Sequence, residues 1–243
     1  GMSNSGMMKT VYRKGLSERY GSLMQTIAGL HYNFSFSDKF FNILLSLEEN
    51  KNEKELKNEV YLHIARNFKR FGWLYFFLYG ASPAVCDSFV EKDKHDLESL
   101  PGGGLYKPNS TSLRMGDLGY ISKAQDDLNI SYNTLDDYCL DLENALTTSY
   151  KAYQEIGEFV DDKRVQLNTS VIQIENEYYS TIRPKRVCPT GERPVNVLRT
   201  KGIEYLELRC VDLDPFSPVG VRRDHIDFMD TLLMYCLLKE SPP

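Results

Sequence analysis

Apolar residues recur at intervals of three and four positions in several parts of the chain, which is the spacing of an amphipathic helix. This spacing predicts helices over residues 9–25, over a long segment ending near Gly80, from a cap at Asn133 or Thr134 onward, and over 225–238. Asp38 is a candidate cap for a further helical segment. The charge-rich stretch 48–59, which precedes the long helix, is expected to be solvated.

Three other segments alternate apolar and polar residues with a period of two, which is typical of half-buried strands. They are residues 30–36, 171–179 and 202–214. Stretches 91–111 and 183–194 are rich in Pro, Gly and charge, so we expect exposed loops there. Strands and long helices mix without a regular βαβ rhythm. The pattern therefore predicts an α+β fold whose largely antiparallel sheet has helices on one face and a partly polar second face.

Composition narrows the classes of function. The chain has 243 residues, of which 42% are hydrophobic, enough for the core of one large domain or two small ones. A net charge of −5 and a pI near 5.5 give no overall attraction to nucleic acid or to anionic membranes, so neither partner is expected. No apolar run approaches the length that spans a bilayer.

The five cysteines are scattered and form no C-x-x-C pair. This argues against a disulfide framework and a structural zinc site, and it predicts a reducing, cytoplasmic setting. The chain opens G-M-S-N-S-G-M-M-K-T, enters an amphipathic pattern almost at once, and stops in S-P-P after a helical pattern. Both ends look cut, so we expect part of a longer protein; no oligomeric state is predicted.

Candidate chemistry appears in G-I-E-Y-L-E-L-R-C-V-D-L-D, residues 202–214. A period of two places Glu207 and Arg209 on one face of this strand and Glu204 on the other. A carboxylate suits a hard cation such as Mg²⁺, and the guanidinium fork matches phosphate oxygens. An exposed ion pair has the same spacing and is commoner, so the spacing alone favours the ion pair.

Other candidate residues carry weaker signals. A lone histidine such as His31 is more often a core or surface residue than a metal ligand. Glu175 and Glu177 suggest a solvated face rather than a metal pair. The basic run 183–186 is a candidate anion site, although a solvated loop is the favoured interpretation. The glycine run 102–104 lacks the Lys-Ser/Thr of a P-loop and is interpreted as a flexible loop.

Five motifs, in order along the chain, carry a resemblance to a known family. They are S-N-S-G-x-x-K-T-V-Y-R-x-G-L-x-x-R-Y-G-x-L-M-Q-T-I-A-G-L-H-Y-N-F, F-G-W with Y-G-A-S-P-A-V-C, T-S-L-R-M-G-D-L-G-Y, Q-I-E-N-E-Y-Y-S-T-I-R-P-K-R and G-I-E-Y-L-E-L-R-C-V-D-L-D-P-F-S-P-V-G-V. Together they resemble bacterial glutamate–cysteine ligase of the gamma-proteobacterial type over essentially the whole chain. The departures fall mainly at residues 48–59 and 91–109.

The resemblance implies ATP-dependent ligation of the γ-carboxyl of L-glutamate to L-cysteine through a γ-glutamyl phosphate, the first step of glutathione synthesis. It implies Mg²⁺ or Mn²⁺ at the phosphates and a funnel-shaped antiparallel sheet related to that of glutamine synthetase. It also implies that residues 1–243 are the central part of the catalytic domain, without an N-terminal acidic segment and a C-terminal helical part. The chain alone would then hold only part of the metal site and have reduced or no activity.

The resemblance also implies roles for individual residues. His31 and Glu207 match metal ligands. Arg209, implied in catalysis together with Glu207, matches a contact to the transferred phosphate, and Arg13 matches a basic residue near the phosphates. The implied substrate-binding residues are Tyr12, Tyr120 and Tyr179 around cysteine, and Gln25 and Arg114 near glutamate.

Two alternatives stay open. The first is a ligase that joins a carboxylate to a different acceptor amine, although the three tyrosines favour cysteine. The second is a non-catalytic module that binds a nucleotide or glutathione. Turnover with cysteine, 2-aminobutyrate or alanine separates the first alternative from the ligase, and binding of Mg·ATP without turnover would favour the second.

Overall fold

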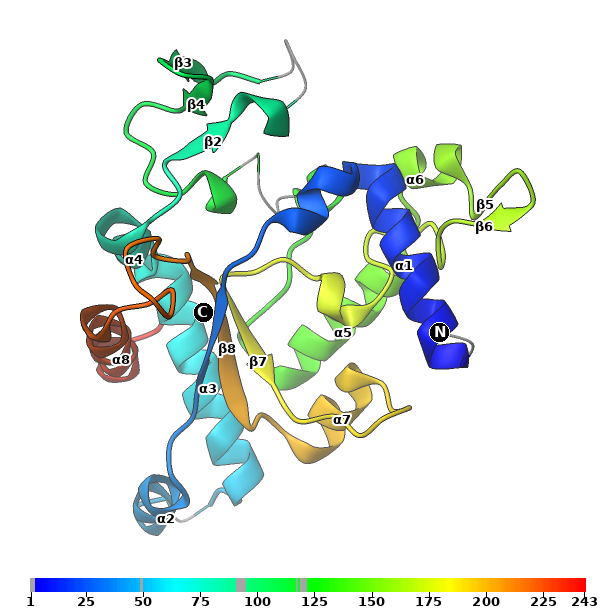
Figure 1. Cartoon of the computed structure of the whole chain (residues 1–243). Helices are drawn as coiled ribbons and strands as arrows, with labels where there is room; N and C mark the ends of the chain where they lie inside the picture. Colours follow the sequence, from blue (N-terminus) through cyan, green and yellow to red (C-terminus); the bar gives the residue numbers. More distant parts are fainter. Residues whose placement is uncertain (1–2, 49, 91–94, 117, 119–121) are drawn as a thin grey trace.

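The strand β8 (Tyr205–Val211) lies at the centre of a three-stranded sheet. It pairs antiparallel with β1 (Leu30–Phe34) on one side and with β7 (Ile182–Lys185) on the other. The computed structural model describes residues 3–48, 50–90, 95–116, 118 and 122–243 (Figure 1). This sheet positions the polar residues of the candidate site.

The two faces of β8 differ as the alternation of its residues predicts. Leu206, Leu208 and Cys210 are at most 1% exposed and belong to the hydrophobic core. Glu207 and Arg209 project from the opposite face and keep partial access to solvent. Burying a leucine side chain contributes roughly 1.5–3 kcal/mol, so this register is strongly preferred over one shifted by a single residue.

Helices cover the apolar face of the sheet. α3 (Glu53–Phe71) contacts β7 and β8 and packs along α8 (Arg223–Leu238) (Figure 1). α3 begins with a capping box in which Asn52 and Glu55 each accept a hydrogen bond from the other's backbone N–H, at 3.0 and 3.1 Å. The charge-rich stretch 48–59 therefore contains a helix start.

The predicted long helix is divided at Gly72 into α3 and α4 (Trp73–Tyr79). A Cβ at Gly72 would lie 2.6 Å from the carbonyl oxygen of Phe68 and 2.8 Å from its ring, so glycine is needed for this close packing. The other helices are α1 (Asn4–Tyr20), α2 (Asp38–Ser46), α5 (Leu135–Thr147), α6 (Lys151–Ile156) and α7 (Pro194–Lys201).

The helix caps agree with the sequence in part. Thr134 caps α5 as predicted, because its hydroxyl accepts the backbone N–H of Asp137 at 3.1 Å. Ser37, rather than Asp38, caps α2. The first helix begins earlier than predicted and ends at Tyr20, and residues 22–26 form a short 3-10 helix, η1 (Ser22–Thr26).

Two of the predicted local structures are wrong. Residues 171–179 form no strand; they contain the 3-10 turn η5 (Glu175–Glu177), in which the Glu177 carboxylate accepts the backbone N–H of Gln173 at 2.7 Å. This side-chain bond satisfies a backbone group that a strand would pair in the sheet. The basic run expected in a solvated loop instead forms β7, with Arg183 only 4% exposed.

The predicted loop 91–111 is also partly ordered as strands. β2 (Ala84–Cys86), β4 (Gly104–Tyr106) and β3 (Glu98–Leu100) form a second antiparallel sheet in the order β2-β4-β3, at the end of the molecule opposite α2 (Figure 1). Gly102 and Gly103 have φ values of 92° and 87°, so they form the β3–β4 turn.

The predicted α+β class with antiparallel sheets is confirmed. A short hairpin of β5 (Phe159–Val160) and β6 (Lys163–Arg164) completes the strands of the described residues. Within the described ranges, every helix is too short or too polar to cross a membrane.

Candidate functional site

The polar face of the three-stranded sheet brings charged residues from all three strands together. In the sheet register Glu207 of β8 stands opposite Asn33 of β1 and opposite Arg183 of β7. Arg209 lies two residues further along the same face. The prediction that Glu207 and Arg209 share one face is confirmed, and the structure adds Arg183 to them.

Three basic side chains surround the Glu207 carboxylate at similar distances. The Nε atoms of Arg183 and Arg209 each lie 3.9 Å from Glu207 Oε1, and His31 Nδ1 lies 3.8 Å from Oε2. These distances are longer than hydrogen bonds, so the groups attract one another without direct bonding. The Glu207 side chain is 13% exposed and therefore accessible to a ligand.

Lys185, at the end of β7, adds a further positive charge to this face. Burial lowers the pKa of Lys185, and the nearby guanidinium of Arg183 lowers it further, whereas Glu207 opposes both effects. We call the surface made by His31, Arg183, Lys185, Glu207 and Arg209 the cationic face. Its described residues hold more basic than acidic groups, which suits a phosphate-bearing ligand.

His31 is half-exposed beside Glu207. Desolvation lowers its pKa, as do the surrounding cations, while Glu207 raises it. A lowered pKa favours the neutral imidazole, which is the form that binds metals. No cluster of three or more His, Cys, Asp and Glu side chains suited to a metal ion occurs in the part of the chain that the structure describes. His31 and Glu207 thus offer two donors, and the carboxylate suits Mg²⁺ or Mn²⁺.

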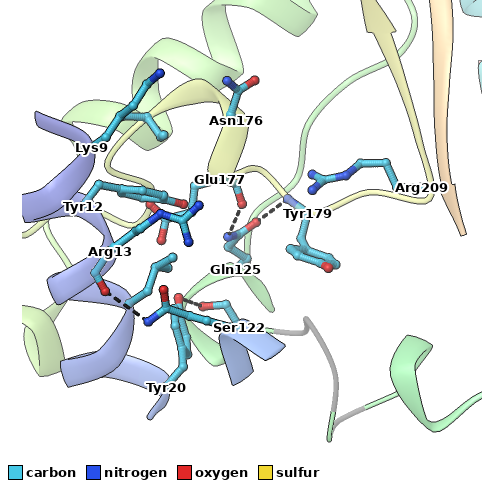
Figure 2. Close-up of a pocket in the computed structure, with 13 residues that line it drawn as sticks. Lys9, Tyr12, Arg13, Tyr20, Ser122, Gln125, Asn176, Glu177, Tyr179 and Arg209 are labelled. Carbon is cyan, nitrogen blue, oxygen red and sulfur yellow. Dashed lines mark hydrogen bonds between the residues drawn. The ribbon is translucent and has the colours of Figure 1, made fainter. Parts of the chain in front are cut away.

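A cavity of about 490 Å³ lies between α1 and the segment 174–179, with Arg209 at one end (Figure 2). Its lining includes five residues implied by the motifs: Tyr12, Arg13, Gln25, Tyr179 and Arg209. The other lining residues are Lys9, Leu16, Tyr20, Ser122, Gln125, Ile174, Asn176 and Glu177.

Arg209 belongs both to the cationic face and to the cavity. Its guanidinium carbon lies 5.7 Å from the centre of the Tyr179 ring, a cation–π contact. Figure 2 shows Arg209 approaching from the sheet while Tyr12 and Arg13 project from α1 on the opposite wall. A ligand in the cavity therefore reaches the cationic face at Arg209.

Gln25 lines the cavity, but its amide is also used within the protein. Its Nε2 donates to the carbonyl oxygen of Arg13 at 3.2 Å and to the hydroxyl of Ser17 at 2.8 Å. These bonds fasten η1 to α1. The predicted contact of Gln25 with a substrate stays a prediction.

Arg114 does not line the cavity. It is buried, and its Nε donates to Asp212 Oδ1 at 2.6 Å. Asp212 Oδ2 accepts the backbone N–H of Ala81 at 3.0 Å and the hydroxyl of Ser82 at 2.8 Å. The structure thus gives Arg114 a tertiary role, and its predicted role near glutamate stays untested. Tyr120 lies outside the described residues.

The family model for glutamate-cysteine ligase matches residues 1–243. The chain belongs to the glutamate–cysteine ligase family. Among the curated ligases, the chain is 50% identical over 248 residues to that of Alcanivorax borkumensis and 48% identical over 243 residues to one from Pseudomonas putida. Both alignments cover 100% of this chain but 47% and 46% of the relative, so the chain spans about half the length of these ligases.

Solved structures give the same result for the fold. A glutamate–cysteine ligase from Francisella tularensis, crystallised in complex with AMP, matches with a TM-score of 0.90 and 42% identity. The match covers 100% of this chain and 47% of that one. A bifunctional glutathione synthetase from Pasteurella multocida shares the fold, with a TM-score of 0.69, 24% identity, and coverage of 99% of this chain and 26% of that chain.

The structure of this family member also corrects the interpretation of two glutamates. Glu177 is 7% exposed and forms an ion pair with Arg19, so it does not belong to a solvated face. The Glu175 side chain is 13% exposed and pairs with Arg193 at 3.2 Å. In the sequence, only its place in the motif Q-I-E-N-E-Y-Y indicates that Glu177 has a functional role.

Gln125 was missed altogether. Its backbone belongs to a short 3-10 helix, η4 (Lys123–Gln125), and it contacts Tyr179, 54 positions away. No local pattern announces such a contact, because it depends on how distant segments pack.

Proposed function

We propose that the chain carries part of the catalytic site of an ATP-dependent glutamate–cysteine ligase. In this reaction an oxygen of the γ-carboxylate of L-glutamate attacks the γ-phosphorus of ATP, and ADP leaves. The amine of L-cysteine then attacks the γ-carbon of the resulting γ-glutamyl phosphate, and phosphate leaves. The observation that carries the proposal is that Arg209 joins the cationic face to the tyrosine-lined cavity.

The cationic face fits the phosphoryl-transfer half of the reaction. Arg209, Arg183 and Lys185 approach a common surface, where they would stabilise negative charge on the transferred phosphoryl group. Arg209 can use its planar fork on two oxygens at once. ATP use is further supported by the Francisella tularensis relative, which was crystallised with AMP.

His31 and Glu207 fit a divalent cation, Mg²⁺ or Mn²⁺, because the lowered pKa of His31 favours the neutral imidazole and the Glu207 carboxylate lies 3.8 Å from it. When bound, the ion would supply electrostatic stabilisation between phosphate oxygens. The described residues provide only these two donors. We therefore propose that residues 1–243 are part of a larger catalytic domain, whose remaining carboxylate ligands lie outside the described residues.

The cavity fits the acceptor half. Tyr12 and Tyr179 provide aromatic walls, and Leu16 and Ile174 add apolar surface suited to a small, weakly polar thiol. Because the cavity ends at Arg209, an amine bound there would lie next to an acyl phosphate held by that residue. This arrangement is compatible with cysteine as the acceptor amine.

A hybrid ligase tests the proposal. Residues 1–243 would replace the matching segment of the Pseudomonas putida relative, which is 48% identical over 243 residues. We expect glutamate- and cysteine-dependent ADP release, with slower turnover when 2-aminobutyrate or alanine replaces cysteine. Arg209→Ala should lower kcat by about 10²-fold or more, whereas Arg223→Ala, at an exposed position of α8, should leave it unchanged.

A folded hybrid that binds ATP but releases no ADP with any acceptor would contradict the ligase assignment and favour a binding module. The isolated chain provides a second test. We expect it to have little or no turnover, and normal turnover would contradict the need for further metal ligands.

A further inference from the structure

The segment that carries Tyr179 is held at two points by one side chain. Gln125 Nε2 donates to the carbonyl oxygen of Glu177 at 3.0 Å, and Gln125 Oε1 accepts the backbone N–H of Tyr179 at 2.8 Å (Figure 2). The amide thus satisfies both backbone groups at the ends of a three-residue stretch. Few other side chains have a donor and an acceptor placed to do this.

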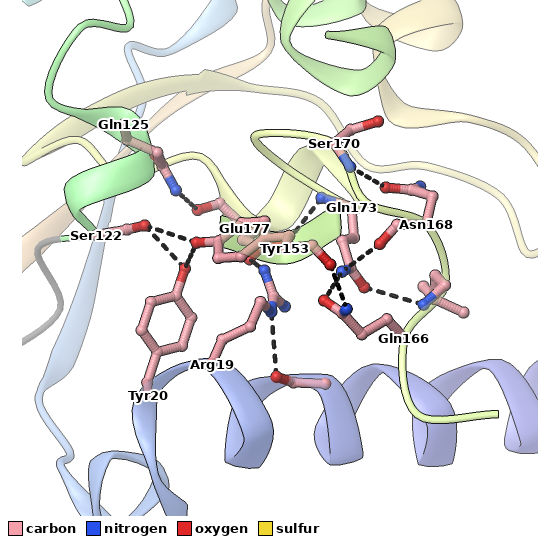
Figure 3. A network of polar contacts seen from close by, with 12 residues as sticks. Arg19, Tyr20, Ser122, Gln125, Tyr153, Gln166, Asn168, Ser170, Gln173 and Glu177 are labelled. Carbon is pink, nitrogen blue, oxygen red and sulfur yellow. Dashed lines mark hydrogen bonds and ion pairs between the residues drawn. The ribbon is translucent and has the colours of Figure 1, made fainter. Parts of the chain in front are cut away.

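A buried ion pair also holds the stretch 177–179 in place. The Glu177 carboxylate pairs with Arg19 and also accepts the backbone N–H of Gln173 at 2.7 Å (Figure 3). The Arg19 side chain is fully buried, with its guanidinium carbon 4.9 Å from the centre of the Tyr153 ring. Removing either partner would leave the other charge buried and unpaired, so the pair resists displacement.

The network extends to the opposite wall of the cavity. Arg19 belongs to α1, the helix that also carries Tyr12 into the cavity. The hydroxyl of Tyr20 donates to the hydroxyl of Ser122 at 2.8 Å, which ties the end of α1 to the segment that leads into Gln125. One set of polar contacts therefore connects α1 with the segment that carries Glu177 (Figure 3).

We propose that Gln125 and the Arg19–Glu177 pair are positioning residues that set the spacing between Tyr12 and Tyr179, and thereby the affinity for the acceptor amine. The inference rests on the proposed function, in which this cavity binds cysteine. The guanidinium of Arg209 contacts the Tyr179 ring, but its backbone is held separately in β8, in the middle of the sheet. Loosening the network should therefore affect the acceptor more than the nucleotide.

Two variants test this inference in the purified chain. Gln125→Met keeps the length of the side chain and removes both hydrogen bonds. Glu177→Gln keeps an acceptor for the Gln173 N–H and removes the charge that pairs with Arg19. Glu143→Gln is the matched control, because Glu143 pairs with Arg199 at 2.9 and 2.6 Å between α5 and α7, and neither residue lines the cavity.

Three quantities would be measured for each protein. They are the affinity for L-cysteine by calorimetry, the affinity for ATP by the same method, and hydrogen–deuterium exchange of the peptide containing residues 174–180. The exchange measurement reports the freedom of the Tyr179 backbone N–H directly and needs no ligand.

We expect Gln125→Met to weaken cysteine binding about tenfold, the effect of losing roughly one good hydrogen bond, and to speed exchange over residues 174–180. The affinity for ATP should change by less than about twofold, whereas a general loss of structure would weaken the binding of both ligands. Glu177→Gln should act in the same direction, and Glu143→Gln should change neither affinity nor exchange of this peptide.

Equal losses of cysteine and ATP affinity, or unchanged cysteine affinity in both variants, would overturn the inference. A different result tests the proposed function itself. In this result, exchange depends on Gln125 while the unmodified chain binds ATP but no cysteine. In that case the hydrogen bonds of Gln125 do position the Tyr179 segment. The cavity is then not the site of the acceptor amine, and the proposed effect on acceptor affinity fails as well.

Discussion

Replacing Arg114 by methionine tests whether its ion pair with Asp212 is a structural element. Arg114 Nε donates to Asp212 Oδ1 at 2.6 Å, and Arg114 Nη1 donates to the carbonyl oxygen of Arg209 at 3.2 Å. Asp212 in turn binds the backbone N–H of Ala81 and the hydroxyl of Ser82. The pair therefore links the end of β8 to the segment between α4 and β2.

The expected loss of stability follows from burial. The side chains of Arg114 and Asp212 are 8% and 2% exposed. Removing one partner of a buried pair leaves the other charge uncompensated and costs about 3–5 kcal/mol. For a chain of this size each kcal/mol lowers Tm by roughly 2–4 °C, so we expect a decrease of about 6–20 °C. Urea unfolding followed by circular dichroism at 25 °C measures the free energy of unfolding directly.

Asp227→Asn is the control, because its pair with Arg223 lies on the exposed surface of α8 and should be almost neutral. If Arg114→Met cost less than about 1 kcal/mol, the structural role would be refuted. The arginine would then be available for the contact with glutamate that the motif predicts.

Three further predictions concern single sites. In the hybrid ligase, Glu207→Gln should abolish ADP release while Glu204→Gln, which is exposed and does not share the cationic face, should retain it; an equally inactive, folded Glu204→Gln protein would contradict the face assignment. Iodoacetamide should label exposed Cys86 before Cys210, because burial raises the pKa of Cys210 to about 12 and keeps it protonated from pH 7 to 9; equal rates in mass spectrometry would contradict this. Gly29→Ala should lower Tm, because its Cβ would lie 2.6 Å from the guanidinium carbon of Arg114; an unchanged Tm would argue against this close approach.

The central strand β8 could be predicted because apolar and charged residues alternate along it. The alternation of Leu206 and Leu208 with Glu207 and Arg209 gives only one register that buries the leucines. The position of His31 on the polar side of β1 follows from the same rule. These residues carry the part of the candidate site that a local pattern can reveal.

The adjacent strand β7 was not predicted, because its local sequence resembles that of a loop. Pro184 and its basic neighbours resemble a loop, yet β7 is an edge strand of the described sheet, where proline's missing N–H is tolerated. The alternation of Ile172 and Ile174 resembled a strand, but the Glu177 carboxylate takes the N–H of Gln173 instead. The contacts of Gln125 depend on tertiary packing, and no spacing in the sequence could have shown them.

On the cationic face, we expect the substitution Glu207→Gln to have opposite effects on the binding of two ligands, pyrophosphate and Mg·ATP. Arg183, Lys185 and Arg209 surround a single described carboxylate, that of Glu207, and the pKa of Lys185 is lowered by burial and by these arginines. Glu207→Gln removes the compensating negative charge, so it should strengthen binding of metal-free pyrophosphate to the chain by several-fold. The same change removes a donor for Mg²⁺ and should weaken the increase in Tm that Mg·ATP produces.

Thermal unfolding with each ligand measures both effects, and Glu204→Gln is the matched control because it removes the same charge outside this face. The opposite signs separate the two roles of Glu207. If the Glu207 carboxylate had only a structural role, its removal would lower the affinities for both pyrophosphate and Mg·ATP. If it formed only a surface ion pair, its removal would change neither affinity. Weaker pyrophosphate binding in Glu207→Gln would therefore refute the view that its carboxylate opposes an anion site, whatever its effect on turnover.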